Sequence, residues 1–287
     1  MTTADKVLSV LGLFSLERPE WTVEEAAAEL RLPVSTAYRY FRSLSGAGLI
    51  VGFTLGRYVL GPAVTQFDRQ MRLHDPLITK AQPVMKRLAR VAPDHGVVLL
   101  CRLYRDQVMC VHQESIEHPD FAISYERGRP MPLIRGAASK SILANLPSRT
   151  VKALHARYAT EMRQVGLGSD WAAVKARLRE LREAEAIITH QELDVGMAGI
   201  SVAVFGPGGD VIGSISFVMP ARVLTQKVAA IAGTHLQEAS SEIHSGLCVL
   251  ALEHSGASTR TPAARRAPRR KSHRFTARGL RKSSETA

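Results

Sequence analysis

One face of a predicted helix carries hydroxyl and guanidinium groups at a spacing that can reach the edges of DNA bases. The run VSTAYRYFRSLSGAGLI, residues 34–50, places apolar side chains at every third or fourth position, so the remaining face is polar. A helix that enters the major groove exposes hydroxyls and basic groups on one side while its other side packs. The polar face consists of Ser35, Thr36, Tyr38, Arg39 and Arg42. This pattern predicts sequence-specific contact with duplex DNA.

The start of this helix and its later turns are expected to make different contacts. Ser35 and Thr36 lie where backbone amides and the positive end of the helix dipole favour a phosphate. We assign Arg39 to a base edge. Phosphates or the flanking minor groove are assigned to Arg42, Arg57 and Tyr58. The spacing alone also fits a small three-helix packing unit with a solvated basic face, and the hairpin that follows favours the DNA-binding interpretation.

Caps and periodicity predict the elements that position this helix. Apolar spacing predicts a first helix over 4–16, and Thr22 with Glu25 forms a capping box that starts a second helix, ending at Leu30. The β-forming run LIVGFTLGRYVL, residues 49–60, predicts a hairpin with its turn near 54–56. The packed face of the third helix is expected to hold Val34, Ala37, Phe41 and Leu44. These elements predict a winged helix-turn-helix over residues 1–61.

A different pattern follows a helical connector, which we assign to residues 62–76. Helical spacing over 64–73 and 77–91 is interrupted at Asp75-Pro76, because proline disfavours helix at the residue before it. An amphipathic helix over 171–184 is expected to lie on a sheet face. The tight turn at 206–209 and a closing helix over 223–247 favour an antiparallel α+β domain over residues 77–250. Its strands are predicted at 97–104, 108–113, 121–125, 200–205 and 211–218.

Most of the positive charge lies in the last part of the chain. The chain has 287 residues and a formal net charge of +12, of which residues 251–287 contribute +8, with ten Lys or Arg against two Glu. We expect a basic tail without packed structure there, which acts as an extra arm on DNA, contacts an acidic partner, or has no selected role. The rest of the chain is nearly balanced.

Composition excludes several other classes of protein. The three cysteines cannot all pair within one chain and show no C-x-x-C spacing, so neither a disulfide framework nor a zinc site is expected. No window approaches the ~18 apolar residues of a membrane span, and the N-terminus has no secretory pattern. We therefore expect a cytoplasmic protein with no membrane association.

The chain resembles the IclR family of bacterial transcription regulators over nearly all of residues 4–247. Family members carry S-T-x-x-R, then G-L-I or G-L-V, then a wing ending Y-x-L-G, which stand here at 35–39, 48–50 and 58–61. The second half adds GRPMPL at 128–133, ASKSILA at 138–144 and Gly196-Met197. The chain has Ser139-Lys140 where relatives usually have Gly-Lys, and Ile134-Arg135 where a basic or imidazole side chain often follows the Pro-Leu step.

The resemblance implies that residues 77–247 form a GAF-like domain that binds a small organic acid, often an aromatic carboxylate. Pocket positions carried over from the family are Met131, Ala137, Ala138, Gly199 and Ser216. The small side chains leave room for a ligand, although such residues beside strands also fit simple packing. Hydrogen bonds or a bidentate ion pair to the carboxylate are expected from Ser201 or Ser216 and from Arg127 or Arg129.

Operator recognition would require two copies of the reading helix at a fixed spacing. We therefore expect a homodimer or tetramer whose connector helices make the dimer contact, and whose effector changes the placement of the paired DNA-binding units. The alternative is an enzyme that acts on a small organic acid, with the basic segments aiding solubility. G-x-S-x-G, P-loop, H-E-x-x-H and dinucleotide motifs are absent, so we expect no enzyme and no cofactor. The His112, Glu114 and His118 cluster is a weak metal candidate, and no metal is expected.

Overall fold

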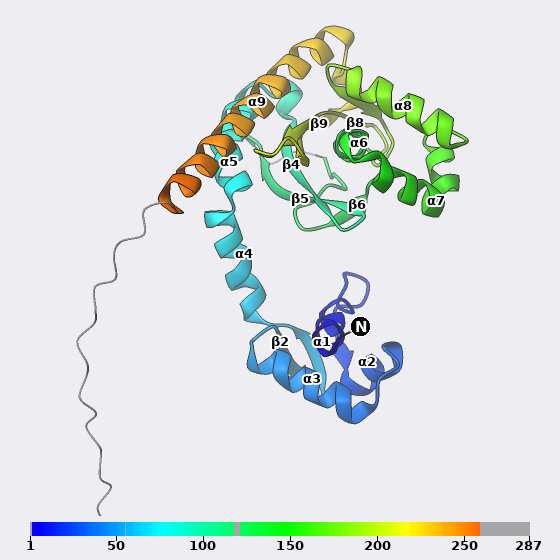
Figure 1. The fold of residues 1–287 in the computed structure, drawn as a ribbon, viewed down its shortest axis with the longest axis vertical. Coiled ribbons are helices and arrows are strands. Elements are labelled where there is room, and N and C mark those ends of the chain that lie inside the picture. The colour runs from blue at the N-terminus through cyan, green and yellow to red at the C-terminus, as the bar shows by residue number, and fades with distance from the viewer. Residues whose placement is uncertain (1, 55, 118–120, 259–287) are drawn as a thin grey trace, which may run out of the picture.

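A computed structural model describes residues 2–54, 56–117 and 121–258 of the chain. It consists of a small N-terminal unit and a larger C-terminal unit joined by one helix, α4, Pro62–His74 (Figure 1). The basic tail was predicted to begin at residue 251, after a closing helix that ends at 247, but residues 251–258 continue that helix, because the stretch from Ala251 to Glu253 favours helix. The rest of the predicted tail, from residue 259 on, lies outside the described residues. Within the described residues, no helix is long and apolar enough to cross a membrane.

The N-terminal unit is a three-helix bundle with a short antiparallel sheet. Its helices are α1 (Thr3–Leu11), α2 (Val23–Glu29) and α3 (Val34–Gly46), and its strands β1 (Trp21–Thr22), β2 (Ile50–Thr54) and β3 (Arg57–Leu60) pair in the order β1-β3-β2. The predicted capping box is confirmed by two hydrogen bonds. The Thr22 hydroxyl accepts from the backbone amide of Glu25, and the Glu25 carboxylate accepts from the backbone amide of Thr22. The core centres on Phe41, Trp21 and Ile50.

Two details of this unit differ from the sequence-based expectation. The first helix ends at Leu11 and not at residue 16, because the chain turns at Gly12 to bring Leu13 under Trp21, whose indole Nε1 donates to the carbonyl of Leu13 (2.9 Å). Val34 is exposed because it begins α3, and Tyr40 takes the packed position instead.

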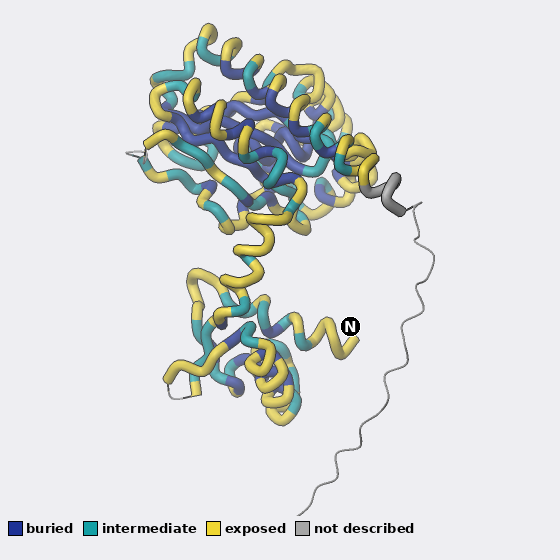
Figure 2. The backbone as a smooth tube through the Cα atoms, turned by 90° about the vertical axis from the view of Figure 1, so that its left-hand side faces the viewer, coloured by how far each residue is buried: buried dark blue, intermediate teal, exposed yellow. Residues whose placement is uncertain are grey.

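The connector continues into α5, Pro76–Val91. Asp75 ends α4 and caps α5, its side chain accepting from the amides of Leu77 and Ile78. The break therefore falls at the predicted Asp75-Pro76 step. No residue of α4 is buried, and Figure 2 shows this helix exposed along most of its length.

The C-terminal unit is built on one six-stranded antiparallel sheet in the order β6-β5-β4-β9-β8-β7, which confirms the predicted α+β class. The 206–209 turn joins β8 to β9 as predicted. Residues 121–125, predicted as a strand, form no ladder, because the amide and hydroxyl of Ser124 are bound by the side chain of Asp194. The strands are β4 (Val97–Tyr104), β5 (Gln107–Glu114), β6 (Pro130–Pro132), β7 (Ile187–His190), β8 (Met197–Phe205) and β9 (Val211–Pro220).

Helices cover both faces of this sheet and create two cores. On one face lie α5 and α9, Gln226–Ser258, with Phe217 and Ile200 beneath them. On the other face lies α6, Ala137–Asn145, which is buried through Ala144. The amphipathic helix predicted to cover the sheet is α8, Trp171–Glu183, but it packs on α6, with α7 (Ser148–Gln164) beside it. Short 3₁₀ turns lie at Pro93–His95 and Ala221–Val223.

Candidate DNA-binding and effector sites

The predicted reading face lies on the outer side of α3. Ser35, Tyr38, Arg39 and Arg42 are exposed and Thr36 is half-buried, while Ala37, Tyr40, Phe41 and Leu44 are buried. Pro33 precedes the helix and no side chain caps its start, within the part of the chain that the structure describes. The first turn can therefore receive a phosphate at its backbone amides.

Tyr38 is tied to the neighbouring helix. Its hydroxyl donates to Oε1 of Glu24 in α2 (2.8 Å), and this hydrogen bond together with the nearby negative charge raises the pKa of the Tyr38 phenol. Its ring stays exposed on the reading face. Its predicted DNA contact remains a prediction.

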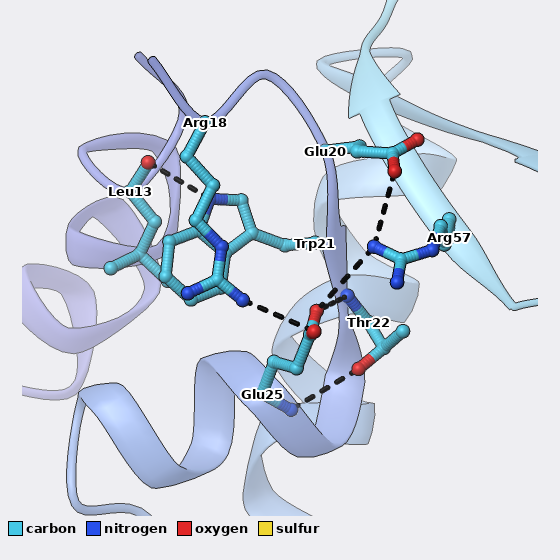
Figure 3. A network of polar contacts seen from close by, with 7 residues as sticks. All are labelled: Leu13, Arg18, Glu20, Trp21, Thr22, Glu25 and Arg57. Atoms are coloured by element: carbon cyan, nitrogen blue, oxygen red, sulfur yellow. Dashed lines mark hydrogen bonds and ion pairs between the residues drawn. The ribbon is translucent and has the colours of Figure 1, made fainter.

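The wing residues Arg57 and Tyr58 also have partners inside the unit. Arg57 forms ion pairs with Glu20 (3.2 Å) and Glu25 (3.8 Å), as Figure 3 shows. The Tyr58 ring packs edge-on against Phe41, with centroids 4.9 Å apart. In the same network Arg18 stacks on the Trp21 ring and pairs with Glu25 (3.2 Å). These contacts fix the wing against α2, so a phosphate contact by Arg57 would require it to share or exchange its carboxylates.

Two exposed residues of the N-terminal unit were not identified from the sequence. Arg31 lies in the turn between α2 and α3 with a left-handed φ of 53°, close to the start of the reading helix. Phe53 is the extra residue at an irregularity in the β2–β3 pairing and is 77% exposed. Arg31 could have been found in the sequence as a basic residue immediately before the third helix.

A small cavity lies between the start of α6 and strands β7, β8 and β9. It has a volume of about 40 Å³. The structure places four of the predicted pocket residues on its wall, namely Ala137, Ala138, Gly199 and Ser216. Met131 lies in the core on β6, and Ser201 lies behind Ser216, whose hydroxyl donates to it (2.8 Å). Small side chains therefore line this cavity.

Neither predicted arginine lines the cavity. Arg127 turns away from it, because Nη2 binds Oδ1 of Asp68 in α4 (2.5 Å) and Nε donates to the carbonyl of Val111 (2.9 Å). The hydrogen bond from Arg127 holds the pKa of the Asp68 carboxyl below its usual value. Arg129 lies near Glu17, whose carboxyl pKa is lowered chiefly by its own backbone amide and Ser15, with a smaller effect from Arg129. Both arginines therefore point toward the connector helix and the N-terminal unit and not into the cavity.

Two carboxylates that no sequence pattern indicated lie on the cavity wall. Glu192 binds the amide of Gly136 through Oε2 (2.9 Å) and Nζ of Lys140 through Oε1 (2.5 Å). Lys140 is 8% exposed and Glu192 is 24% exposed, so the pair is largely shielded from water. Asp194 accepts from the amide (2.8 Å) and the hydroxyl (2.5 Å) of Ser124. No short motif links residues so far apart in the chain.

The unusual serine beside Lys140 has a structural role. Ser139 Oγ lies 2.7 Å from the hydroxyl of Tyr125, another residue of the cavity wall. Burial raises the pKa of Tyr125 well above its usual value, so its ring carries a neutral hydroxyl. The cavity wall therefore carries hydroxyls, small side chains and two carboxylates, each of which already has hydrogen-bond partners in the protein.

The described residues contain no group of three His, Cys, Asp or Glu side chains placed to hold a metal. His112 and Glu114 form a pair (2.9 Å), and the third member of the cluster considered above, His118, falls outside the described residues.

Comparison with known proteins assigns both units. Residues 71–245 match the model of the bacterial transcriptional regulator IclR C-terminal family, and residues 3–51 match the IclR helix-turn-helix domain. The HTH-type transcriptional regulator KipR of Bacillus subtilis is 27% identical over 219 residues, which cover 75% of this chain and 84% of KipR.

Two solved structures share the fold. An IclR family transcriptional regulator from Brucella abortus matches with a TM-score of 0.70 at 20% identity, covering 85% of this chain and 92% of that one. An IclR homolog from Microbacterium hydrocarbonoxydans complexed with 4-hydroxybenzoate matches with a TM-score of 0.65 at 20% identity, covering 86% of this chain and 100% of that one.

Proposed function

The chain belongs to the IclR family of bacterial transcriptional regulators, and from that premise we propose that it binds a specific operator through α3 and responds to a small organic acid in the cavity beside α6. It is an IclR-type regulator with an N-terminal DNA-binding domain and a C-terminal effector domain. The observation that carries the proposal is the exposed hydroxyl and guanidinium face of α3 in this helix-turn-helix.

We propose that the contacts divide along that face. Arg39 reaches a base edge, since a guanidinium can bind guanine O6 and N7 together. Ser35 and Thr36 hold a phosphate at the start of α3. Further backbone or minor-groove contacts are proposed for Tyr38, Arg42, Arg57 and Tyr58.

Arg39→Ala should weaken binding to the selected operator by about 10- to 100-fold and relax the preference at one base position, because a bidentate base contact is lost. A gel shift with nonspecific competitor measures this. Arg42→Ala should weaken all sequences alike, and Arg179→Ala, an exposed arginine on α8, is the neutral control. Operator affinity of Arg39→Ala equal to wild type would remove Arg39 from the reading face.

We propose that α4 also holds two copies of the chain together. Val64, Phe67 and Met71 recur at three- and four-residue spacing along α4, and all three are exposed. An apolar stripe of this spacing is the seam by which two helices pair. Pairing there would set the distance between the two copies of α3, as two half-sites of an operator require.

Phe67→Glu should raise the dimer dissociation constant by at least about tenfold, because each copy would bury a carboxylate in the seam. Analytical ultracentrifugation measures the constant. Thr65→Glu adds the same charge on another side of α4 and should leave it unchanged. Equal dissociation constants for Phe67→Glu and wild type would place the dimer contact elsewhere.

The acid effector is proposed from the cavity and from the 4-hydroxybenzoate bound by the Microbacterium relative. The cavity is close to the size of a water molecule, so an aromatic acid would enter only if the segment 191–194 moves outward. Glu192 already occupies the amide of Gly136 at the start of α6, where the helix dipole favours a negative charge. We propose that the carboxylate of the effector replaces that of Glu192 there.

A bound acid should raise the melting temperature of the effector domain by about 5–10 °C at 100 times its Kd. The test is a thermal-shift panel of benzoate, 4-hydroxybenzoate and short aliphatic acids, with benzamide as the neutral match for benzoate. Gly199→Leu should abolish the shift, because even a Cβ at this position would lie 3.3 Å from that of Ala137. Absence of any acid-dependent shift in wild type would contradict the acid effector.

A further inference from the structure

Ion pairs join the connector helix to the effector domain. Asp68, in the middle of α4, binds Arg127, and Asp75, at its end, binds Arg102 of β4. No residue of α4 is buried. The direction of α4, which carries the DNA-binding domain, therefore depends on contacts that a small displacement can break.

The segment that supplies Arg127 also forms part of the cavity wall. We call residues 124–129 the strap. At its start, Ser124 binds Asp194 and Tyr125 binds Ser139, and both Tyr125 and Asp194 line the cavity. Arg127 follows two residues later and binds Asp68. The strap thus connects the cavity to α4 within four residues of chain.

The strap is held to the sheet close to Arg127. The amide of Gly128 donates to the carbonyl of Cys110 (2.9 Å), and Nε of Arg127 donates to that of Val111, both in β5. Because Gly128 is anchored, a displacement at Tyr125 is concentrated in residues 126 and 127, and it must break the contact between Nε of Arg127 and Val111 to move the guanidinium away from Asp68.

Asp68 has a second arginine that can take over its carboxylate. Arg72, one turn along α4, binds Oδ2 (3.1 Å) while Arg127 binds Oδ1 (2.5 Å). Asp68 and Arg127 are 30% and 28% exposed, so neither group is deeply desolvated when the pair opens. The Asp68 carboxylate can thus adopt two arrangements that differ little in free energy. In one it binds Arg127 of the effector domain, and in the other it binds only Arg72 of α4.

We infer that Arg127 is a positioning residue, which transmits the state of the cavity to the direction of α4 by holding or releasing Asp68. The inference rests on the proposed function, since it names how the same cavity acts on operator binding. Entry of a ligand displaces Asp194 or Tyr125, the strap shifts, Arg127 releases Asp68, and α4 becomes free to reorient. Each state differs in contacts that a ligand can favour, as allosteric coupling requires.

The test measures the direction of α4 without needing the effector. Spin labels on Ser45→Cys in α3 and Ala176→Cys in α8 report the distance between the two domains by pulsed electron paramagnetic resonance. The full chain carries Cys248→Ser so that only buried cysteines remain, and labelled chains are diluted with unlabelled ones. Variants are Arg127→Gln, Ser124→Ala and their combination. Arg72→Gln is the matched control, because it removes an arginine from the same carboxylate without crossing between domains.

Arg127→Gln and Ser124→Ala should each broaden the distance distribution, and the double variant should broaden it no further, because both break one pathway. Arg72→Gln should leave the distribution as narrow as wild type. A distribution unchanged in Arg127→Gln or in Ser124→Ala, or effects that add, would overturn the inference. Operator affinity, expected to fall about fivefold in Arg127→Gln, is measured separately. If wild-type protein binds no operator, the proposed function is contradicted, but the distance measurements still test the role of Arg127.

Discussion

Gly61→Ala is expected to destabilise the DNA-binding domain strongly. Gly61 joins the wing to α4, and a Cβ there would lie 2.2 Å from the carbonyl oxygen and 2.9 Å from the carbonyl carbon of Gly48. The same junction carries hydrogen bonds from Gly61 to Leu49 (2.8 Å) and from Ala63 to Gly48 (3.0 Å), so the backbone cannot retreat without breaking them. We expect a cost of about 3 kcal/mol or more, against a total stability of roughly 3–9 kcal/mol for a unit of about 60 residues.

Chemical unfolding followed by circular dichroism should show an early transition for this variant, and operator binding should fall with it. Gly46→Ala is the matched control, because a Cβ there meets no atom within 4 Å, and it should be neutral or slightly stabilising. Wild-type stability for Gly61→Ala would mean that the wing and α4 join with another geometry.

Glu192→Gln is expected to destabilise the effector domain by about 2–3 kcal/mol. The amide can still accept from Gly136, but Lys140, which is 8% exposed, loses its only carboxylate partner in the described residues. Removing one member of a buried ion pair costs more than the pair contributes, because an uncompensated charge remains. Because Glu192 is partly exposed, the loss of stability should lie below the ~3–5 kcal/mol of fully buried pairs. Thermal unfolding measures the change, with Glu183→Gln on the exposed face of α8 as the control.

Glu192→Gln also tests whether the Glu192 carboxylate occupies the place of the effector carboxylate or has only a structural role. If the effector carboxylate takes the place of Glu192, then benzoate or a short aliphatic acid should stabilise Glu192→Gln more than it stabilises wild type. Adding Lys140→Met removes the unpaired charge, so the double variant should recover stability and lose the extra response to acid. Equal acid responses in wild type and Glu192→Gln would show that the ligand does not use this place.

Local signals in the sequence predicted the DNA-binding domain well. Each of these local signals relates residues to neighbours no more than four positions away: the capping box of Thr22 and Glu25, the packed positions Ala37, Phe41 and Leu44, and the break at Asp75-Pro76. The error at Val34 arose because periodicity does not say where a helix meets its neighbours. The α+β class followed from strands and turns that are likewise local.

The contacts that join distant segments could not be predicted in this way. Lys140 with Glu192 and Asp68 with Arg127 link residues 52 and 59 positions apart, and no spacing rule relates them. Arg127 was predicted to bind a carboxylate ligand because its acidic partner, Asp68, lies far away in the sequence. The small residues Ala137, Ala138 and Gly199 were placed by resemblance and do line the cavity, since only short side chains fit between α6 and the sheet.

The specificity of the intact protein for DNA tests operator recognition most directly. An operator is selected from random duplexes with the full chain, and its affinity is compared with that of unselected duplex at one physiological salt concentration. We predict a preference of at least about 10³-fold for a site with two related half-sites one helical turn apart. Equal affinity for both DNAs would contradict sequence-specific operator binding.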